Sequence, residues 1–283
     1  MKVNRTFVIV DRDEMSKNTE WADAHDAICS AINKVSWPPD ESSGLFKLTR
    51  IITLKEGKTY VDLKGKEATW NKPLKHFRNG VVPLRRAFRS RMEETLDWKS
   101  EEPLSLTQYF EESRKATGTA KICLYPSGEA VTEAMHEGLG EFDFWFKSES
   151  GLRVVVEWET GNVSSSHRSL NKMCLALIGG LVDAAVLIVP SRDLATHLTD
   201  RIGNIKELQP YFYFWQHSGT QIKRGLLAVI EVEHDMIVNS TDLRDLIPSG
   251  KDGNADKKPI KRSVKKRDKD KASTKKKAKK RDA

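Results

Sequence analysis

The sequence predicts an α/β protein in which a mixed sheet is flanked by helices and a disordered basic tail follows. The run Val154–Val156 has no polar alternation, which is typical of a strand covered on both sides. Residues 166–182 carry apolar side chains at the 3.6-residue period of a helix with one buried face. Residues 251–283 hold sixteen Lys or Arg against five Asp and no aromatic residue, so burial cannot offset the entropy cost of ordering them.

The composition is that of a globular chain, because 38% of the 283 residues are apolar. No apolar run approaches the roughly 20 residues needed to span a bilayer, and the first residues lack a signal-peptide pattern. We therefore expect a cytoplasmic protein with no membrane partner. Cys29, Cys123 and Cys174 are odd in number and widely spaced, which argues against disulfides and a zinc site and predicts core thiols.

The predicted elements divide the chain into three parts: a mixed α/β region at 1–117, a core at 118–248 and the tail at 249–283. Apolar patterning predicts strands at 7–11, 48–54 and 58–63 and helices at 24–35 and 85–98 in the first part. In the core it predicts helices at 128–140 and 166–182 and strands at 141–147, 152–158, 184–190 and 226–235.

Basic side chains gather in residues 72–91. Arg85 and Arg89 fall at helical spacing with Phe88 between them, so one helical face would be basic and would suit contact with the phosphate backbone of DNA. The alternative is that arginines of this helix pair with the acidic residues that follow, which are Glu93, Glu94 and Asp97. Both interpretations stay open.

Three carboxylates form the candidate metal site. Glu157 and Glu159 are two apart in an extended run, so their side chains project from the same face. If the hairpin before this run is centred near Ser150, positions summing to 300 face each other, which places Asp143 opposite Glu157. Oxygen ligands that leave room for water are those that Mg²⁺ prefers. The alternative is a solvated sheet edge, which the apolar run before Glu157 disfavours.

An aspartate, a turn and then Glu-x-Glu on the next strand resembles the core of the PD-(D/E)XK nucleases, in the form where glutamate replaces the usual lysine. The order of elements after Glu159 is similar to that of the BamHI and BglII group of Type II restriction endonucleases, and the resemblance spans roughly Gly118 to Asp235. Two departures are that no proline precedes Asp143 and that Glu159 stands where most of the superfamily has lysine.

The resemblance implies a restriction-endonuclease-like fold and Mg²⁺-dependent hydrolysis of phosphodiester bonds. Asp143, Glu157 and the Trp158 carbonyl would hold one or two ions, and Glu159 would be the general base. Lys172, on the helix that follows, is the runner-up for the residue that replaces the missing lysine.

Related nucleases also carry an acidic residue on the helix before the first catalytic strand. Glu129 and Glu133 are the candidates, and Glu133 is favoured because it lies one turn nearer that strand.

Further polar residues are candidates for DNA contact. Asn162 and Ser164 stand where the resemblance places residues facing the major groove, although an Asx turn and a helix N-cap suit them equally. His167 and Arg168 lie on the polar face of the helix 166–182, where His167 would touch a phosphate. Arg201 and Asn204 are suited to base edges, and packing of their segment is the equal alternative.

A second acidic cluster competes for the metal. Glu231, Glu233, His234 and Asp235 form another Glu-x-Glu with a neighbouring imidazole. No acidic strand lies just upstream at hairpin distance, so this cluster ranks below the first.

The implied partner is double-stranded DNA, bound by a homodimer because a two-fold axis matches a palindromic site. The basic tail would hold the protein near DNA, and thus near the nucleoid, without sequence preference; a nuclear-import signal and a solubilising end are the alternatives. The alternative function is a non-cleaving or repair-associated DNA-binding protein with a nuclease-like core.

Overall fold

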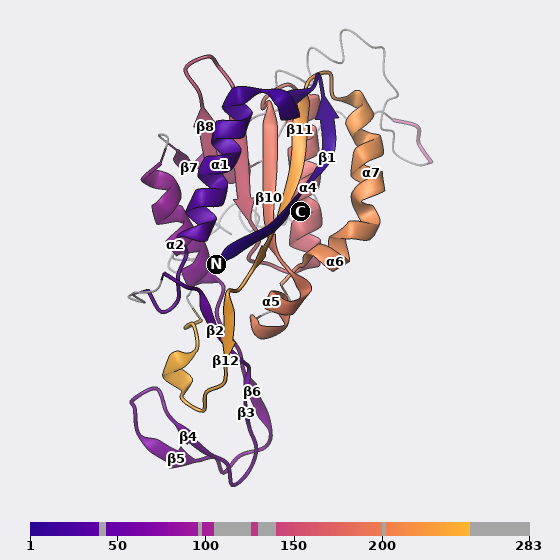
Figure 1. Cartoon of the computed structure of the whole chain (residues 1–283). Coiled ribbons are helices and arrows are strands. Elements are labelled where there is room, and N and C mark those ends of the chain that lie inside the picture. Colours follow the sequence, from indigo (N-terminus) through magenta and orange to yellow (C-terminus); the bar gives the residue numbers. More distant parts are fainter. Residues whose placement is uncertain (40–43, 96–97, 105–125, 130–139, 200–201, 250–283) are drawn as a thin grey trace, which may run out of the picture. The chain divides into compact units, whose positions relative to one another are not determined.

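The computed structural model describes residues 1–39, 44–95, 98–104, 126–129, 140–199 and 202–249, which belong to one compact unit. At its centre is a six-stranded sheet of order β1-β11-β10-β9-β8-β7 (Figure 1). The predicted mixed sheet flanked by helices is confirmed. The strands are β1 (Lys2–Arg12), β7 (Lys99–Leu104), β8 (Gly140–Lys147), β9 (Arg153–Trp158), β10 (Ala184–Pro190) and β11 (Gly225–Glu233).

Strand direction gives the sheet two different edges. Strands β9, β10 and β11 run parallel, whereas β1, β7 and β8 pair antiparallel with their neighbours. The last residues of β9, β10 and β11 therefore lie at one edge, which we call the C-terminal edge. In open α/β sheets this edge is where ligands bind.

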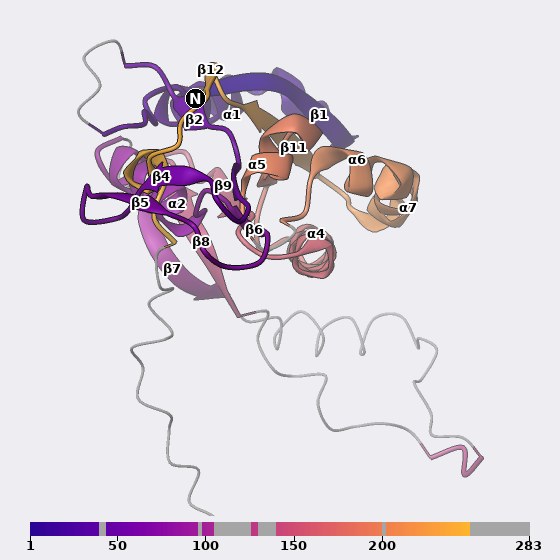
Figure 2. The ribbon, with the colours of Figure 1, turned by 90° about the horizontal axis from the view of Figure 1, so that it is seen from below.

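Helices cover both faces of the sheet (Figure 2). One face packs against α1 (Thr19–Asn33) and α2 (Val82–Glu93), and the other against α4 (Val163–Ile178), α6 (Ile205–Leu208) and α7 (Phe212–Ser218). The structure also describes the helix α5 (Arg192–His197) and the 3₁₀ helices η1 (Met15–Lys17), η2 (Gln209–Tyr211), η3 (Gly219–Gln221) and η4 (Leu243–Asp245).

Burial of β9 and β10 follows from this layering. Every residue of Val154–Val156 and Ala184–Leu187 has no exposed surface. Each buried valine or leucine side chain stabilises the fold by about 1.5–3 kcal/mol relative to exposure. The prediction that β9 is covered on both sides is confirmed.

Helix α4 begins earlier than its apolar stripe indicated. The Asn162 side chain accepts hydrogen bonds from the backbone N–H groups of Ser164 and Ser165, which starts the helix at Val163 instead of residue 166. The helix ends at Ile178, before Gly180 takes a left-handed φ of 61°.

Three two-stranded sheets extend the fold below the six-stranded sheet in Figure 1. Strand β12 follows β11 and pairs parallel with β2, while the pairs β3–β6 and β4–β5 are antiparallel. Their strands are β2 (Lys47–Thr49), β3 (Ile52–Leu54), β4 (Thr59–Val61), β5 (Glu67–Thr69), β6 (Lys75–Phe77) and β12 (Met236–Val238).

Two structural observations bear on the predicted division of the chain into three parts. Strand β1, from the region 1–117, pairs with β11 of the predicted core. The predicted boundary near residue 118 and almost all of the tail 249–283 lie outside the described residues. Among the helices that the structure describes, none combines the length and apolar character required to cross a bilayer.

Candidate active site

Asp143 and the strand β9 meet where the β8–β9 ladder ends. Phe144 pairs with Val156, so positions summing to 300 face each other as predicted. Beyond that pair, the Asp143 carboxylate accepts a hydrogen bond of 2.9 Å from the backbone N–H of Trp158. The aspartate therefore lies beside the segment that carries Glu157 and Glu159.

The side chains of β8 break their alternation at this point. Phe142 packs in the core on the α4 side, whereas Phe144 packs in the core on the α1 and α2 side. Residues two apart in a regular strand share a face, so the alternation breaks at Asp143. This break lets the carboxylate turn toward β9.

Arg85 of α2 also contacts the aspartate. Its guanidinium donates a hydrogen bond of 3.1 Å to Asp143 Oδ1. Burial raises the pKa of Asp143 to about 6, Arg85 and the Trp158 N–H oppose the rise, and the charge of Glu157 adds to it. The carboxyl group thus holds a proton more tightly than an exposed aspartate does.

Glu157 is held by α4. Ser169 donates a hydrogen bond of 2.6 Å to Glu157 Oε2, and the Lys172 ammonium contacts Glu157 Oε1. The same ammonium donates to the Glu141 carbonyl at 2.7 Å and lies 4.2 Å from the centre of the Phe142 ring. Lys172 is therefore next to the cluster, as its position on the polar face of the helix predicted.

Glu159 is the most buried of the three, with 4% of its surface exposed. Its Oε1 accepts a 2.5 Å hydrogen bond from the Gly161 N–H, while its Oε2 is buried with no hydrogen-bond partner among the described residues. Burial raises its pKa; the nearby Ser166 hydroxyl works against this rise, although it forms no regular hydrogen bond. A Cβ at position 161 would lie 2.5 Å from Ser165 Oγ and 3.2 Å from Glu159 Oε1, which explains the glycine.

The chemistry of Asp143, Glu157 and Glu159 suits a divalent cation, although in the described part of the chain their oxygens do not reach the 4.8 Å mutual spacing that Asp193, Glu233 and His234 have. The donors are carboxylate oxygens, the preferred ligands of Mg²⁺, and one of them is a buried oxygen without a partner among the described residues. Two of the carboxyl groups have raised pKa values because the site concentrates negative charge in a desolvated place. A cation would relieve this unfavourable charge.

A family model described as restriction endonuclease BamHI matches residues 1–254. The chain belongs to the BamHI restriction endonuclease family. The predicted membership of the BamHI and BglII group is confirmed.

Two curated relatives of the BamHI family resemble the chain. The Type II restriction enzyme OkrAI of Oceanobacter kriegii is 46% identical over 105 residues, which cover 37% of this chain and 52% of OkrAI. The Type II restriction enzyme BamHI of Bacillus amyloliquefaciens is 32% identical over 188 residues, which cover 66% of this chain and 71% of BamHI. The match to OkrAI thus spans about half of that relative's length.

Among solved structures, the restriction endonuclease BglII complexed with a DNA 16-mer is similar to this chain. It has a TM-score of 0.47 and 10% identity, and the match covers 84% of each chain.

Several residues that were candidates for DNA contact in this BamHI-family chain have structural partners. Asn162 is the N-cap of α4, and Ser164, whose side chain is exposed, donates its backbone N–H to that cap. Asn204 caps α6 in a capping box with Glu207.

The other candidates are His167, Arg168, Arg89 and Arg201 for DNA contact and Glu133 for catalysis. The His167 ring packs edge-on to Tyr211 with 4.4 Å between centroids, whereas Arg168 is exposed. Arg89 pairs along α2 with Glu93 at 2.9 Å, as the alternative for this helix predicted. Glu133 and Arg201 lie outside the described residues.

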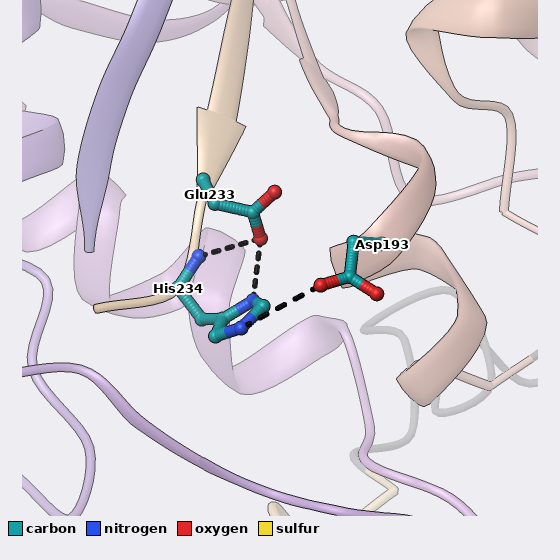
Figure 3. Close-up of side chains that lie close together, drawn as sticks. All are labelled: Asp193, Glu233 and His234. Carbon is teal, nitrogen blue, oxygen red and sulfur yellow. Dashed lines mark hydrogen bonds and ion pairs between the residues drawn. The ribbon is translucent and has the colours of Figure 1, made fainter. Parts of the chain in front are cut away.

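The competing cluster separates into different interactions in the structure. Glu231 pairs with Arg5 at 2.5 Å, and Asp235 binds the amino group of Met1 at 2.9 Å. Glu233 and His234 instead lie near Asp193, and the ligand atoms of these three are within 4.8 Å of one another (Figure 3).

Protein groups bind the Glu233 carboxylate of the trio in Figure 3. The Glu233 carboxylate accepts hydrogen bonds from the Ser191 hydroxyl and the His234 backbone N–H. Burial works to raise the pKa of Glu233, but hydrogen bonds from His234 and Ser191 outweigh it and lower the pKa. Asp193 is 67% exposed, so its charge is solvated. His234 Nδ1 forms an ion pair with Glu233, but like Glu159 Oε2 it has no regular hydrogen-bond partner among the described residues.

Sequence reasoning missed the serines of α4 and the position of Arg85. Ser166 and Ser169 stand six and three residues before Lys172, so all three share one helical face. The spacing of Ser166, Ser169 and Lys172 could have predicted that this face of α4 is turned toward Glu157 and Glu159. The contact between Arg85 and Asp143 joins residues 58 apart and has no local signal.

Proposed function

We propose that this chain is a Type II restriction endonuclease that hydrolyses double-stranded DNA at a short palindromic site with Mg²⁺, and leaves 5′-phosphate ends. Family membership supports the reaction class. The observation that carries the site assignment is that Asp143 binds the backbone between Glu157 and Glu159, so three carboxylates share one edge of the sheet. A homodimer would present two such sites to the two strands of a palindrome.

The chain's own groups divide the work. Asp143, Glu157 and the Trp158 carbonyl would hold the ion, and Glu159 would accept a proton from the attacking water through its buried carboxylate. The bond between phosphorus and the 3′ oxygen breaks as the water oxygen bonds to phosphorus. When bound, Mg²⁺ neutralises charge on the phosphate and assists the departure of the 3′ oxygen.

Other residues would position these groups or bind DNA. Lys172 and Ser169 orient Glu157, and Arg85 orients Asp143. Glu133 is proposed as the acidic residue of the preceding helix, and Lys172 remains the runner-up for the base. The candidates for DNA contact are Asn162, Ser164, His167, Arg168, Arg201, Asn204, Arg85 and Arg89.

Incubation of the purified protein with plasmid DNA tests the proposal. Discrete fragments are expected with Mg²⁺, and sequencing their ends would give the site and the 5′-phosphate. With Ca²⁺ in place of Mg²⁺ we expect a mobility shift without cutting. A smear with Mg²⁺ would contradict sequence specificity, and a shift without cutting under both ions would favour the non-cleaving alternative.

A further inference from the structure

Residues 50–78 form a small two-sheet projection, which we call the basic arm. It contains the antiparallel pairs β3–β6 and β4–β5 and extends beyond the six-stranded sheet in Figure 1. Its basic side chains are Arg50, Lys55, Lys58, Lys64, Lys66, Lys72, Lys75 and Arg78.

The arm differs in charge from the rest of the folded chain. It has eight basic and three acidic residues, a net charge of +5. The other residues up to 250 include 24 basic and 32 acidic side chains, a net charge of −8. Positive charge ahead of the tail is thus concentrated in 29 of 250 residues.

These positive charges face water. Seven of the eight basic residues are exposed, and Lys58 is half-buried. Among the residues that the structure describes, none of the eight makes an ion pair with a carboxylate. Asp62 accepts the backbone N–H groups of Lys64 and Lys66 and offsets part of their charge, but exposed cations outside ion pairs are available to a polyanion.

An aromatic core holds the arm together. The Trp70 ring packs edge-on between Tyr60 at 5.8 Å and Phe77 at 5.6 Å, between centroids. Beneath them lies a small apolar cluster that includes Leu54 and Leu243. The lysines therefore extend from packed hairpins, so less conformational entropy is lost when they bind a partner than in a disordered segment.

Chain topology places the arm at the C-terminal edge of the sheet. Strand β11 ends at Glu233 and continues into β12, which pairs with β2, and β2 leads directly into the arm at Arg50. Glu157 and Glu159 come at the end of β9, which runs parallel to β10 and so to β11. The arm and the candidate carboxylates therefore leave the sheet at the same edge.

We propose that the basic arm binds the phosphate backbone of duplex DNA beside the base pairs at the active site. This inference rests on the proposed function, because the carboxylates require a phosphate at that edge. DNA carries one charge per roughly 1.7 Å of its axis, which suits an array of separate lysines. The contact adds affinity without reading sequence.

The test compares two triple variants of the full chain that lose the same charge. K55Q/K64Q/K66Q removes exposed cations of the arm, and K17Q/K147Q/K223Q removes exposed cations at the opposite edge, near the ends of β1 and β8 and the start of β11. Both keep the basic tail, so its contribution cancels. Affinity for a short and a long duplex of the same central sequence is measured with Ca²⁺ over a range of salt concentrations.

For the arm variant we expect affinity for the long duplex to fall at least about tenfold at low salt. The slope of log affinity against log salt should shrink by about 0.9 for each phosphate that the variant no longer neutralises. Affinity for the short duplex should fall less. The control variant should bind like the wild type, and so should K55R/K64R/K66R, which keeps the positive charges. These readouts need no cleavage, so they stand apart from a failure of the proposed nuclease activity.

Two results would overturn the inference. One is equal affinity and salt slope for the arm variant, the control and the wild type. The other is unchanged DNA binding with a loss of self-association in sedimentation velocity, which would mean that the arm binds a second copy of the acidic body. Thermal unfolding of each variant checks that the charge changes leave the fold intact.

Discussion

The Asp143 carboxylate accepts a 2.9 Å hydrogen bond from the backbone N–H of Trp158, the residue between Glu157 and Glu159. One carboxylate is thereby tied to the backbone that carries the other two. A hydrogen bond to a charged group contributes about 1.5–3 kcal/mol, so this contact also helps to fix the end of β9. The position of Asp143 is therefore coupled to the backbone of the Glu157–Glu159 segment.

Replacing Asp143 with Asn tests the role of the aspartate charge. The amide keeps an oxygen that can accept from Trp158 but loses the negative charge that would hold the ion. We expect cleavage to fall more than about a hundredfold, since even residues that only orient metal ligands typically cost 10- to 100-fold. A plasmid-cleavage time course measures this, and circular dichroism checks folding. A fully active Asp143→Asn protein would eliminate the site.

The raised pKa of Asp143 predicts a link between pH and stability. Its folded pKa of about 6 exceeds the unfolded value of 3.8, so the metal-free native state binds the proton more tightly. The free energy of unfolding should therefore decrease as pH rises between about 4 and 6, by on the order of 2 kcal/mol. Denaturant titrations without metal measure this, and Asp143→Asn should flatten the dependence.

Metal should compete with that proton. Because the ion requires the ionised carboxylate, cleavage at limiting Mg²⁺ should rise with pH around a midpoint near 6. Saturating Mg²⁺ should move the midpoint to lower pH. A midpoint that does not respond to the Mg²⁺ concentration would exclude Asp143 as the titrating ligand.

Glu159→Lys separates catalysis from binding. The carboxylate is 4% exposed and its Oε2 has no partner among the described residues, so lysine would replace the proposed proton acceptor with a buried cation. Cleavage should fall by about 10²- to 10⁴-fold, the usual contribution of general acid–base catalysis, while DNA binding persists. Gel shifts with Ca²⁺ measure binding. Wild-type cleavage by this variant would remove Glu159 from the mechanism.

Lys172→Met distinguishes a charge partner from a base. Lys172 and Glu157 are 15% and 14% exposed, so the variant leaves a mostly buried carboxylate without its cation. We expect the metal-free protein to lose about 3 kcal/mol of stability. Without the competing ammonium, half-saturation should need less Mg²⁺, and saturating Mg²⁺ should restore most cleavage. If cleavage stays abolished at saturating Mg²⁺, Lys172 takes over the role given to Glu159.

Local patterns predicted the parts of this site that neighbouring strands form. The turn near Ser150 and the period of two predicted the register that pairs Phe144 with Val156, and Asp143 follows that pair with its carboxylate on the Trp158 N–H. The apolar run before Glu157 predicted a covered strand, because a half-exposed strand would alternate.

Local sequence patterns could not predict the contacts between residues far apart in the chain. Arg85 is a predicted DNA contact that also donates to Asp143, and this second contact was not predicted because the packing of α2 on the sheet decides which way that helical face turns. The break in alternation between Phe142 and Phe144 has no sequence signal either, since both are phenylalanine. The sequence allowed Asn162 to contact a base or to cap a helix, and the structure establishes only that it caps α4.

Asn162→Ser separates capping from base recognition. Serine caps helices about as well as asparagine, so the free energy of unfolding should change by less than about 0.5 kcal/mol. Serine lacks the amide that pairs with adenine, whose bidentate contact is worth about 1–3 kcal/mol of discrimination. If Asn162 also contacts a base, cleavage at the cognate site should fall by about 10- to 100-fold in a variant of normal stability. Asn162→Ala should lose about 1 kcal/mol of stability as well, because it removes the cap. Normal cleavage by Asn162→Ser would leave Asn162 with its structural role alone, since the cap is the one feature that both residues supply.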